Sequence, residues 1–409
     1  MTWKIPLGSV KLTGGMLNGV VDVLHSEWFS PGPRVKEFEE AIAQIHGSKY
    51  GMMVNSGTDA LRIALLSLKE KFGWQDGDEV IVPSITFVAT VNVILQAGLK
   101  PVIADVDPLT WVLEHYEFSE KFTDRTRCVI PVHMFGLPAD MPRIKGFCEN
   151  RGIKVIEDSC EAMGVGFHSQ WGSETGAPKV YNPVGSFGDF ACFSTYSCHL
   201  IVTGIGGLVT TSNNDLDELA RSYANHGRDA YYIGGKRVEG KDPRELIEKR
   251  FLYHRTGYSA RCSEFEAAVG LAQINGLASN VKRRQQIADE LRTSLTELEF
   301  RNLIKMQRIP VNRTSANMMF PILLKDKSLD RTQICMELEA AGIETRLGMP
   351  LVTQPVYQSW LNPDEYPVGK NFAQRAFYVG CHPGMNDADV FYLIKHLRSS
   401  ILKEVSVAA

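Results

Sequence analysis

The sequence predicts an α/β fold in which a mostly parallel sheet is covered by helices on both faces. Short apolar segments, typical of buried strands, alternate with helical patterns along the N-terminal half of the chain. This alternation indicates βαβ units, whose parallel strands are buried on both faces. The chain has 409 residues, of which 44% are hydrophobic and 22% charged, so it is long and apolar enough for a large core and two domains.

The predicted elements follow one another in a regular order. Residues 34–46 carry apolar side chains at helical spacing, and a short apolar strand at 51–54 precedes a helix that opens at Asp59. Residues 190–196 and 206–211 resemble two strands joined by a turn that contains glycine. The elements between them are strands at 79–82, 101–105, 128–133 and 154–157 and helices at 90–98 and 141–152.

An amphipathic stretch at 263–299 ends this alternation, and we expect it to connect two domains. Its charged run, which begins VKRRQQ, is typical of a helix surrounded by solvent. The large domain then spans residues 1–279 and a smaller α/β domain spans residues 280–409, and residues 1–30 can pack on either domain. In the small domain we expect a strand at 318–323 and helices at 330–342 and 387–397.

Charge and cysteine content exclude several classes of protein. The chain has 44 Lys and Arg against 47 Asp and Glu, and a net charge of −3 gives no electrostatic case for binding nucleic acid or an anionic membrane. The 8 cysteines form no Cys-x-x-Cys pair and are typical of reduced cytosolic thiols. No signal pattern opens the chain, and no uncharged apolar run reaches the ~18 residues of a membrane span. We expect a cytoplasmic protein.

The first candidate site lies between the strand at 51–54 and the following helix. Ser56, Gly57 and Thr58 place two hydroxyls and several backbone N–H groups at a helix N-terminus, which is a favourable setting for a phosphate. A helix cap uses the same residue types, so this segment alone does not distinguish the two roles.

Two more segments are candidates for a ligand site. Asp158 follows Glu157 at the carboxyl end of a predicted parallel strand, the edge at which open α/β sheets bind their ligands. A buried aspartate there can hold a protonated ring nitrogen, or it can cap the next helix. Residues 190–199 precede a glycine-rich turn at 204–207, which indicates close backbone approach but is common in proteins.

The order and spacing of these motifs resemble the DegT/DnrJ/EryC1/StrS family of sugar aminotransferases and dehydratases. The resemblance extends from about residue 5 to residue 400 and implies the aspartate-aminotransferase fold (pyridoxal phosphate fold type I), with a three-layer large domain and a smaller C-terminal domain. It also implies the cofactor pyridoxal phosphate (PLP) and its amine form, pyridoxamine phosphate. The matching motifs are SGT at 56–58, VPSITFVATVNVILQAGLKPVIADVD at 82–107, VIEDSCEA at 155–162, GSFGDFACFSTY at 185–196, GIGGLVTT at 204–211, NHGRD at 225–229 and GYSARCSEFEAAVGLAQ at 257–273.

The resemblance assigns roles around the cofactor phosphate. Ser56, Gly57 and Thr58 match the turn that binds the phosphate in this family, and Ser194 adds a hydroxyl. Asn225 matches a residue that reaches the phosphate bound by the neighbouring subunit. The resemblance therefore also implies a homodimer with shared active sites.

Three more residues match positions around the cofactor ring. Phe87 matches the aromatic side chain that stacks on the pyridine ring. Asp158 matches the carboxylate that pairs with the pyridinium nitrogen, and a nearby anion favours the protonated ring, which then accepts electrons. Glu161 lies where many members have Gln or His near the ring hydroxyl.

The chain departs from the aminotransferases at residue 199. His199 replaces the lysine that holds the cofactor covalently, and Lys179 and Lys236 lie in two polar or glycine-rich segments, 167–187 and 232–247, that are expected to be loops. The same exchange marks the sugar 3-dehydratases, such as GDP-4-keto-6-deoxymannose 3-dehydratase. A lone histidine is usually structural, but at this position a proton-transfer role is favoured, and an ordinary imidazole pKa of ~6.5 leaves it partly neutral near pH 7.

Another branch with this exchange carries an iron–sulfur cluster. Its signature places cysteines shortly after the glycine–arginine–aspartate segment. Here residues 227–229 are followed by no cysteine before Cys262, so the sequence does not supply the thiolates that a cluster needs. We expect PLP bound without a covalent bond, and neither a cluster nor another metal.

The resemblance implies a 3-dehydratase that acts on a nucleotide-linked 4-keto-6-deoxy sugar, with a donor such as glutamate restoring the cofactor amine. Two alternatives stay open: a related enzyme with another outcome, such as transamination, and a regulatory protein that binds the cofactor without catalysis. Ile205 replaces a glutamate that is common in the family, which leaves the substrate class open. Arg346 and residues 167–187 are candidates for substrate contacts or for plain surface.

Overall fold

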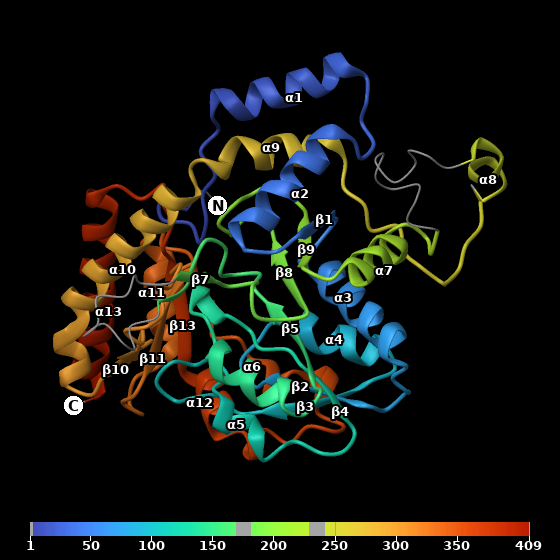
Figure 1. Cartoon of the computed structure of the whole chain (residues 1–409). Helices are drawn as coiled ribbons and strands as arrows, with labels where there is room; N and C mark the ends of the chain where they lie inside the picture. The colour runs from blue at the N-terminus through green and yellow to red at the C-terminus, as the bar shows by residue number, and fades with distance from the viewer. Residues whose placement is uncertain (1–2, 169–180, 229–241, 250, 409) are drawn as a thin grey trace, which may run out of the picture.

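The computed structural model describes residues 3–168, 181–228, 242–249 and 251–408. Within these residues the large sheet has seven strands in the order β1-β9-β8-β5-β4-β2-β3 (Figure 1). The pairs from β3 to β8 are parallel, whereas β9 is antiparallel to both of its neighbours, as the glycine-containing turn predicted. The strands are β1 (Tyr50–Val54), β2 (Glu79–Pro83), β3 (Lys100–Ala104), β4 (Thr126–Val129), β5 (Lys154–Asp158), β8 (Phe190–Ser194) and β9 (Gly207–Thr211).

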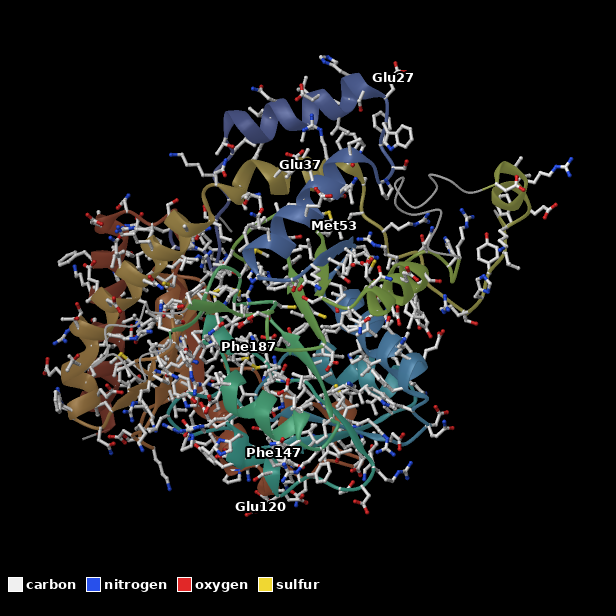
Figure 2. All side chains as sticks on the ribbon, viewed as in Figure 1. Glu27, Glu37, Met53, Glu120, Phe147 and Phe187 are labelled. Carbon is white, nitrogen blue, oxygen red and sulfur yellow. The ribbon has the colours of Figure 1, made fainter. Side chains whose placement is uncertain are left out.

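Helices cover both faces of this sheet, which confirms the predicted three-layer α/β architecture. Side chains alternate along each strand, so Ile81 of β2 packs with one set of helices while Val80 and Val82 pack with the other. Side chains fill the space between the layers, as around buried Met53 (Figure 2). The first set is α2 (Pro33–Ile45), α6 (Met141–Glu149) and α9 (Glu264–Ile274), and the second is α3 (Gly57–Phe72), α4 (Val88–Gln96) and α7 (Asn214–Ala224).

A second sheet of four antiparallel strands lies beside the first, with α10 and α13 on its outer side (Figure 1). The predicted strand and helices of the C-terminal third are confirmed, whereas β10, β12 and β13 were not predicted. Helix α10 crosses residue 280, so the division of the chain at that residue stays a prediction. These elements are β10 (Ile304–Met306), β11 (Met319–Leu324), β12 (Thr345–Leu347), β13 (Ala376–Gly380), α10 (Leu277–Phe300), α11 (Arg331–Ala340) and α13 (Asp387–Ala408).

The N-terminal segment contacts the residues beside the small sheet and a helix that covers the large sheet. The backbone N–H of Ile5 donates to Gly342, and that of Leu7 donates to the carboxylate of Glu344, beside the small sheet. Helix α1 (Gly14–Ser26) instead lies along α9 of the large domain (Figure 1). Residues 3–30 therefore pack on both predicted domains.

Several details differ from the sequence-based prediction. Strand β4 ends at Val129, because Pro131 has no N–H to donate to a neighbouring strand. Helix α3 begins at Gly57, because the Ser56 side chain already caps it. The two segments predicted to be loops, 167–187 and 232–247, contain parts of two short strands and of a short helix. The charged helix α10 was predicted to be surrounded by solvent, but its Arg284 side chain is buried. The remaining elements are β6 (Gly166–His168), β7 (Tyr181–Pro183), α5 (His115–Ser119), α8 (Pro243–Glu248), α12 (Pro367–Arg375) and the 3₁₀ turns η1 (Met134–Gly136), η5 (Leu351–Thr353), η6 (Pro355–Tyr357) and η7 (Pro363–Glu365).

None of the helices in the described part of the chain is long and apolar enough to cross a membrane.

Candidate functional site

The predicted phosphate turn lies against the ends of two central strands. Ser56 Oγ accepts the backbone N–H of Asp59 at 3.1 Å, so it caps α3. Gly57 is buried so tightly that a Cβ atom there would lie 2.9 Å from Cys160 Sγ and 3.0 Å from Ser194 Cβ. The structure thus brings Gly57 and Ser194 together, with half-buried Thr58 beside them. Backbone N–H groups and hydroxyls converge here, as a phosphate requires.

Asp158 lies at the carboxyl end of β5, buried between two donors. Thr90 Oγ1 donates to Oδ2 at 3.0 Å, and the backbone N–H of Cys160 donates to Oδ1 at 3.3 Å. Desolvation of the carboxyl raises the pKa of Asp158 above its ordinary value. A positively charged ring nitrogen beside it would offset that cost. The predicted helix-capping role was wrong, because turns and then a strand at 166–168, with no helix in residues 159–168, follow Asp158, and the backbone N–H that it accepts belongs to a turn. Its pairing with a ring nitrogen stays a prediction, for which a buried carboxyl is suited.

Phe87 is connected to Asp158 through two threonines. Thr86 Oγ1 lies 2.8 Å from Thr90 Oγ1, and because Thr90 donates to Asp158, Thr86 is the donor in this contact. Phe87 follows Thr86 directly, and its side chain is 60% exposed although it is apolar. An aromatic face that its own chain leaves open is suited to stacking on a ring.

Glu161 lies three residues after Asp158 and is half-buried. Its carboxylate accepts the backbone N–H of Phe135. Desolvation raises the pKa of Glu161 to about 8, and the negative charge of Asp158 acts in the same direction. Glu161 is therefore largely in its acid form near pH 7, so it can donate a hydrogen bond to an oxygen near it.

His199 lies in the loop between β8 and β9, five residues after Ser194, and is half-buried. Its Nδ1 lies 3.3 Å from the carbonyl oxygen of Tyr196, and the tautomer in which Nδ1 donates leaves Nε2 as a proton acceptor. Desolvation, with a contribution from the positive charge of Arg284, lowers the pKa of His199 to about 4, although the hydrogen bond with Tyr196 opposes the shift. The expectation of an ordinary imidazole pKa was therefore wrong, because the ring is shielded from water and lies near a cation. It is neutral throughout the range around pH 7.

Asn225 ends α7 and is only 6% exposed, so its own chain covers the side chain. It pairs through its backbone with Ser259, and the next residue, Ala260, accepts the backbone N–H of Asn55 at 3.0 Å, just before the phosphate turn. Its amide oxygen has no hydrogen-bond partner among the described residues. The structure thus leaves an unused polar atom beside this turn, and contact with a partner's phosphate stays a prediction.

Three residues near the site were not predicted from the sequence. Thr86 and Thr90 carry the detectable signal of two hydroxyls four residues apart at a helix start. Tyr378 of β13 contacts Phe135, with ring centroids 5.5 Å apart, and desolvation followed by the charge of Glu161 raises the pKa of Tyr378. Its strand belongs to the other sheet, so no local pattern relates it to Glu161.

The predicted substrate contacts are placed only in part. Arg346 is half-exposed on β12, opposite Tyr378, and donates to Glu344 at 2.7 Å. It lies at the edge of the small sheet, on the side that carries Tyr378. Residues 169–180, with Lys179, and the segment with Lys236 lie outside the described residues.

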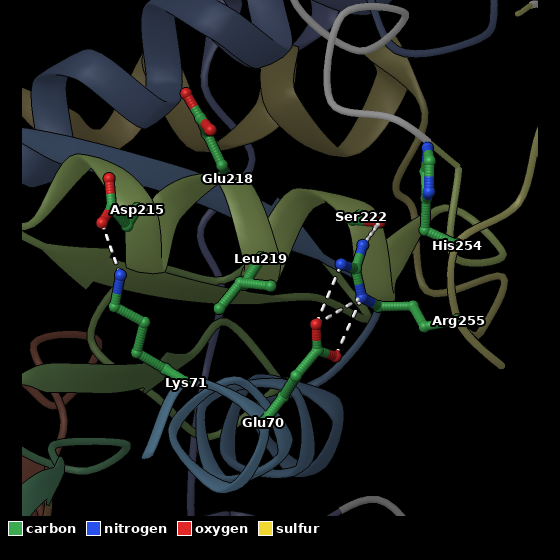
Figure 3. Close-up of a pocket in the computed structure, with 8 residues that line it drawn as sticks. All are labelled: Glu70, Lys71, Asp215, Glu218, Leu219, Ser222, His254 and Arg255. Carbon is green, nitrogen blue, oxygen red and sulfur yellow. Dashed lines mark hydrogen bonds and ion pairs between the residues drawn. The ribbon is translucent and has the colours of Figure 1, made fainter. Parts of the chain in front are cut away.

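A separate hollow lies between α3 and α7 (Figure 3). Two ion pairs lie across it, because Glu70 binds Arg255 and Lys71 binds Asp215. None of the predicted site residues lines it, so we do not assign it to the site.

The residues at the carboxyl edge of the sheet fit a phosphorylated pyridine. The turn at Gly57 and Ser194 suits a phosphate, the open face of Phe87 suits an aromatic ring, and buried Asp158 suits a ring cation. PLP carries all three groups. The donor set of this chain is therefore consistent with that cofactor.

Comparison with known proteins gives the family. Residues 12–398 match the model of the DegT/DnrJ/EryC1/StrS aminotransferase family. The chain is 29% identical over 397 residues to a GDP-perosamine synthase of Caulobacter vibrioides, covering 96% of this chain and 97% of the other, and 31% identical over 396 residues to an uncharacterised protein of Methanocaldococcus jannaschii, covering 94% of each.

A solved structure of Escherichia coli GDP-4-keto-6-deoxy-D-mannose-3-dehydratase with bound hydrated PLP superposes with a TM-score of 0.84 at 25% identity, covering 97% of this chain and all of that one. This likeness confirms the predicted fold type I. The chain therefore belongs to the DegT/DnrJ/EryC1/StrS aminotransferase family, whose members are PLP-dependent enzymes that modify sugars.

Proposed function

We propose that the protein is a 3-dehydratase that removes the 3-hydroxyl of a nucleotide-linked 4-keto-6-deoxy sugar, with PLP and its amine form bound without a covalent bond. The observation that carries this proposal is the neutral imidazole of His199 on the loop that follows Ser194, at the position where aminotransferases have lysine. Imidazole accepts a proton but forms no stable bond with the cofactor aldehyde. This favours proton transfer over covalent attachment.

The bound cofactor would supply a ring that stores electrons while bonds at the sugar break. The turn at Ser56–Thr58 and Ser194 holds its phosphate. Phe87 would stack on the ring, and Asp158 would pair with the ring nitrogen and favour its protonated form. Their positions follow from the helix cap, the exposed ring and the buried carboxylate described above.

His199 and Glu161 divide the proton handling. Once the cofactor amine has joined the C4 ketone of the sugar with loss of water, His199 Nε2 would remove a proton from the C4′ carbon, and the electron pair of that C–H bond would expel the 3-hydroxyl, which would leave as water after protonation. Glu161, in its acid form, donates a hydrogen bond to the ring hydroxyl oxygen. Hydrolysis then releases a 3-deoxy-4-keto sugar and ammonia, and a donor such as glutamate restores the amine.

The main alternative is an aminotransferase-like enzyme with another outcome, and the similarity to a GDP-perosamine synthase favours it. A panel of nucleotide-linked 4-keto sugars, analysed by mass spectrometry with glutamate present, distinguishes the two. Loss of an oxygen function with release of ammonia supports dehydration, and gain of an amine supports transamination. If no sugar reacts and glutamate does not alter the absorption of bound PLP, the protein is a cofactor-binding regulator and the proposal is wrong.

We infer that the active unit is a homodimer. Several large apolar side chains are exposed on the single chain, and a second subunit would cover them. They lie on α1 and around the site: Leu17, Val21, Leu24, Tyr196 and Ile205.

Hybrid dimers test whether the sites are shared. We expect Asn225→Ala chains and Ser194→Ala chains to be poorly active alone and to regain activity when mixed, because one site in each hybrid keeps both residues. Asn225 is packed near the phosphate turn of its own chain, so the opposite result would be equally informative. If mixing restores nothing although hybrids form, both residues act within one chain.

A further inference from the structure

Arg284 of α10 is a buried cation that has no carboxylate partner among the residues that the structure describes. Its side chain is 2% exposed. The guanidinium donates to the side-chain oxygen of Asn280 at 2.8 Å, to the carbonyl oxygens of Met318 (2.8 Å) and Cys381, and at 3.5 Å to the carbonyl oxygen of His199. In the described part of the chain, all of these acceptors are neutral amide oxygens. A buried charge held only by dipoles is costly, so its retention requires a reason.

The acceptors of Arg284 come from separate parts of the fold. Met318 immediately precedes β11, Cys381 immediately follows β13, and His199 lies in the loop after β8. One guanidinium therefore connects two strand ends of the small sheet to the loop that carries His199. The planar fork of arginine can bind several acceptors in fixed directions, which a lysine ammonium cannot do in the same way.

The surroundings of His199 make Arg284 its principal charged neighbour. On its own loop it contacts the backbone carbonyl oxygen of Tyr196. The segment after β13 brings Cys381 and His382 to Arg284. Desolvation and then the charge of Arg284 also lower the pKa of His382 to about 4, although Asp389 opposes this, so both histidines near this cation are neutral.

We infer that Arg284 is a positioning residue that fixes the His199 loop against the small sheet and places a permanent positive charge beside the imidazole. This inference rests on the proposed role of His199 as the base. Desolvation lowers the pKa of Arg284 itself only to about 10, so the charge persists at neutral pH. Its effect is to disfavour the imidazolium, so that His199 is available to accept a proton.

The test is a histidine titration by NMR, in the full-length protein without substrate. The His199 signal is identified by its absence in His199→Asn. We expect the wild-type ring to stay neutral down to about pH 5 and Arg284→Met to raise its midpoint by about 1 pH unit. Arg284→Lys keeps the charge, so its midpoint stays close to wild type. Arg292→Met, on the same helix with partners Asp289 and Asn317, is the matched control and leaves the midpoint unchanged.

Kinetics test the positioning part separately. We expect Arg284→Lys to lower kcat about tenfold or more with little change in KM, because one ammonium cannot hold all the carbonyl acceptors. If Arg284→Met does not fold, the Lys variant alone decides: an unchanged kcat overturns the inference. A folded Arg284→Met with an unshifted His199 midpoint overturns it as well. The titration needs no turnover, so its result does not depend on the proposed reaction. The kinetics of His199→Asn test that reaction separately.

Discussion

Replacing Gly57 by alanine should weaken cofactor binding as well as the fold. The new Cβ would lie 2.9 Å from Cys160 Sγ and 3.0 Å from Ser194 Cβ, closer than ordinary contacts, and neither neighbour ends in a long flexible chain. Overpacking of this kind typically costs ~1–3 kcal/mol. Relief requires the start of α3 to move away from Ser194, which opens the phosphate turn. We expect PLP affinity to fall at least tenfold, which corresponds to ~1.4 kcal/mol.

The assay is a titration of cofactor-free protein with PLP, followed by absorption, in buffer without phosphate. Gly146→Ala is the matched control, because a Cβ there meets nothing within 4 Å and Gly146 lies inside α6. Alanine at that helical position should stabilise the fold by ~0.5–1 kcal/mol and leave PLP affinity unchanged. Inorganic phosphate should compete with PLP in the wild type. If Gly57→Ala binds PLP within threefold of wild type, the phosphate does not lie at this turn.

Three further predictions follow from the titratable groups. His199→Asn should lower kcat ~10²–10⁴-fold with PLP affinity unchanged, and a wild-type kcat would make His199 a packing residue. In wild-type protein, kcat/KM should stay level between about pH 4, the pKa of His199, and about pH 8, the pKa of Glu161, and should decline outside this range. Glu161→Gln should remove only the decline above pH 8. Burial also lowers the pKa of His46 to about 4, so unfolding binds a proton below the ordinary pKa of 6.5. The free energy of unfolding should therefore fall by about 3 kcal/mol from this residue as the pH drops from 6.5 to 4, and urea titrations of His46→Gln should lack that loss.

The buried apolar strands of the large sheet were easy to predict from the sequence, and the short, exposed strand β12 of the small sheet was not. Val80, Ile81 and Val82 are all apolar because helices cover both sides of β2. Strand β12 has only three residues, and two of them, Arg346 and Leu347, are exposed, so no apolar pattern marks it. Its position depends on pairing with β13, which lies later in the chain. The residues of β12 alone therefore do not indicate a strand.

The site shows the same division between local and non-local signals. The phosphate turn and Asp158 follow strands directly, so a motif identifies them before their partners are known. Arg284 belongs to a charged run that resembles a solvated helix surface, yet the structure buries it. The difference arises because its acceptors come from three other segments that meet only in the folded chain.

The two proton-handling groups at the site have pKa values in the reverse of their ordinary order. Ordinary values of 4.5 for glutamate and 6.5 for histidine would leave the glutamate protonated and the histidine neutral together in fewer than about 1 in 100 molecules at any pH. Here desolvation raises the pKa of Glu161 to about 8 and lowers that of His199 to about 4, because it disfavours the charged form of each. The nearest charge reinforces the shift in both cases: Asp158 acts on Glu161, and Arg284 acts on His199. At pH 7 about nine molecules in ten therefore have a carboxyl that can donate together with an imidazole that can accept, which is the arrangement that acid–base chemistry at a bound cofactor requires.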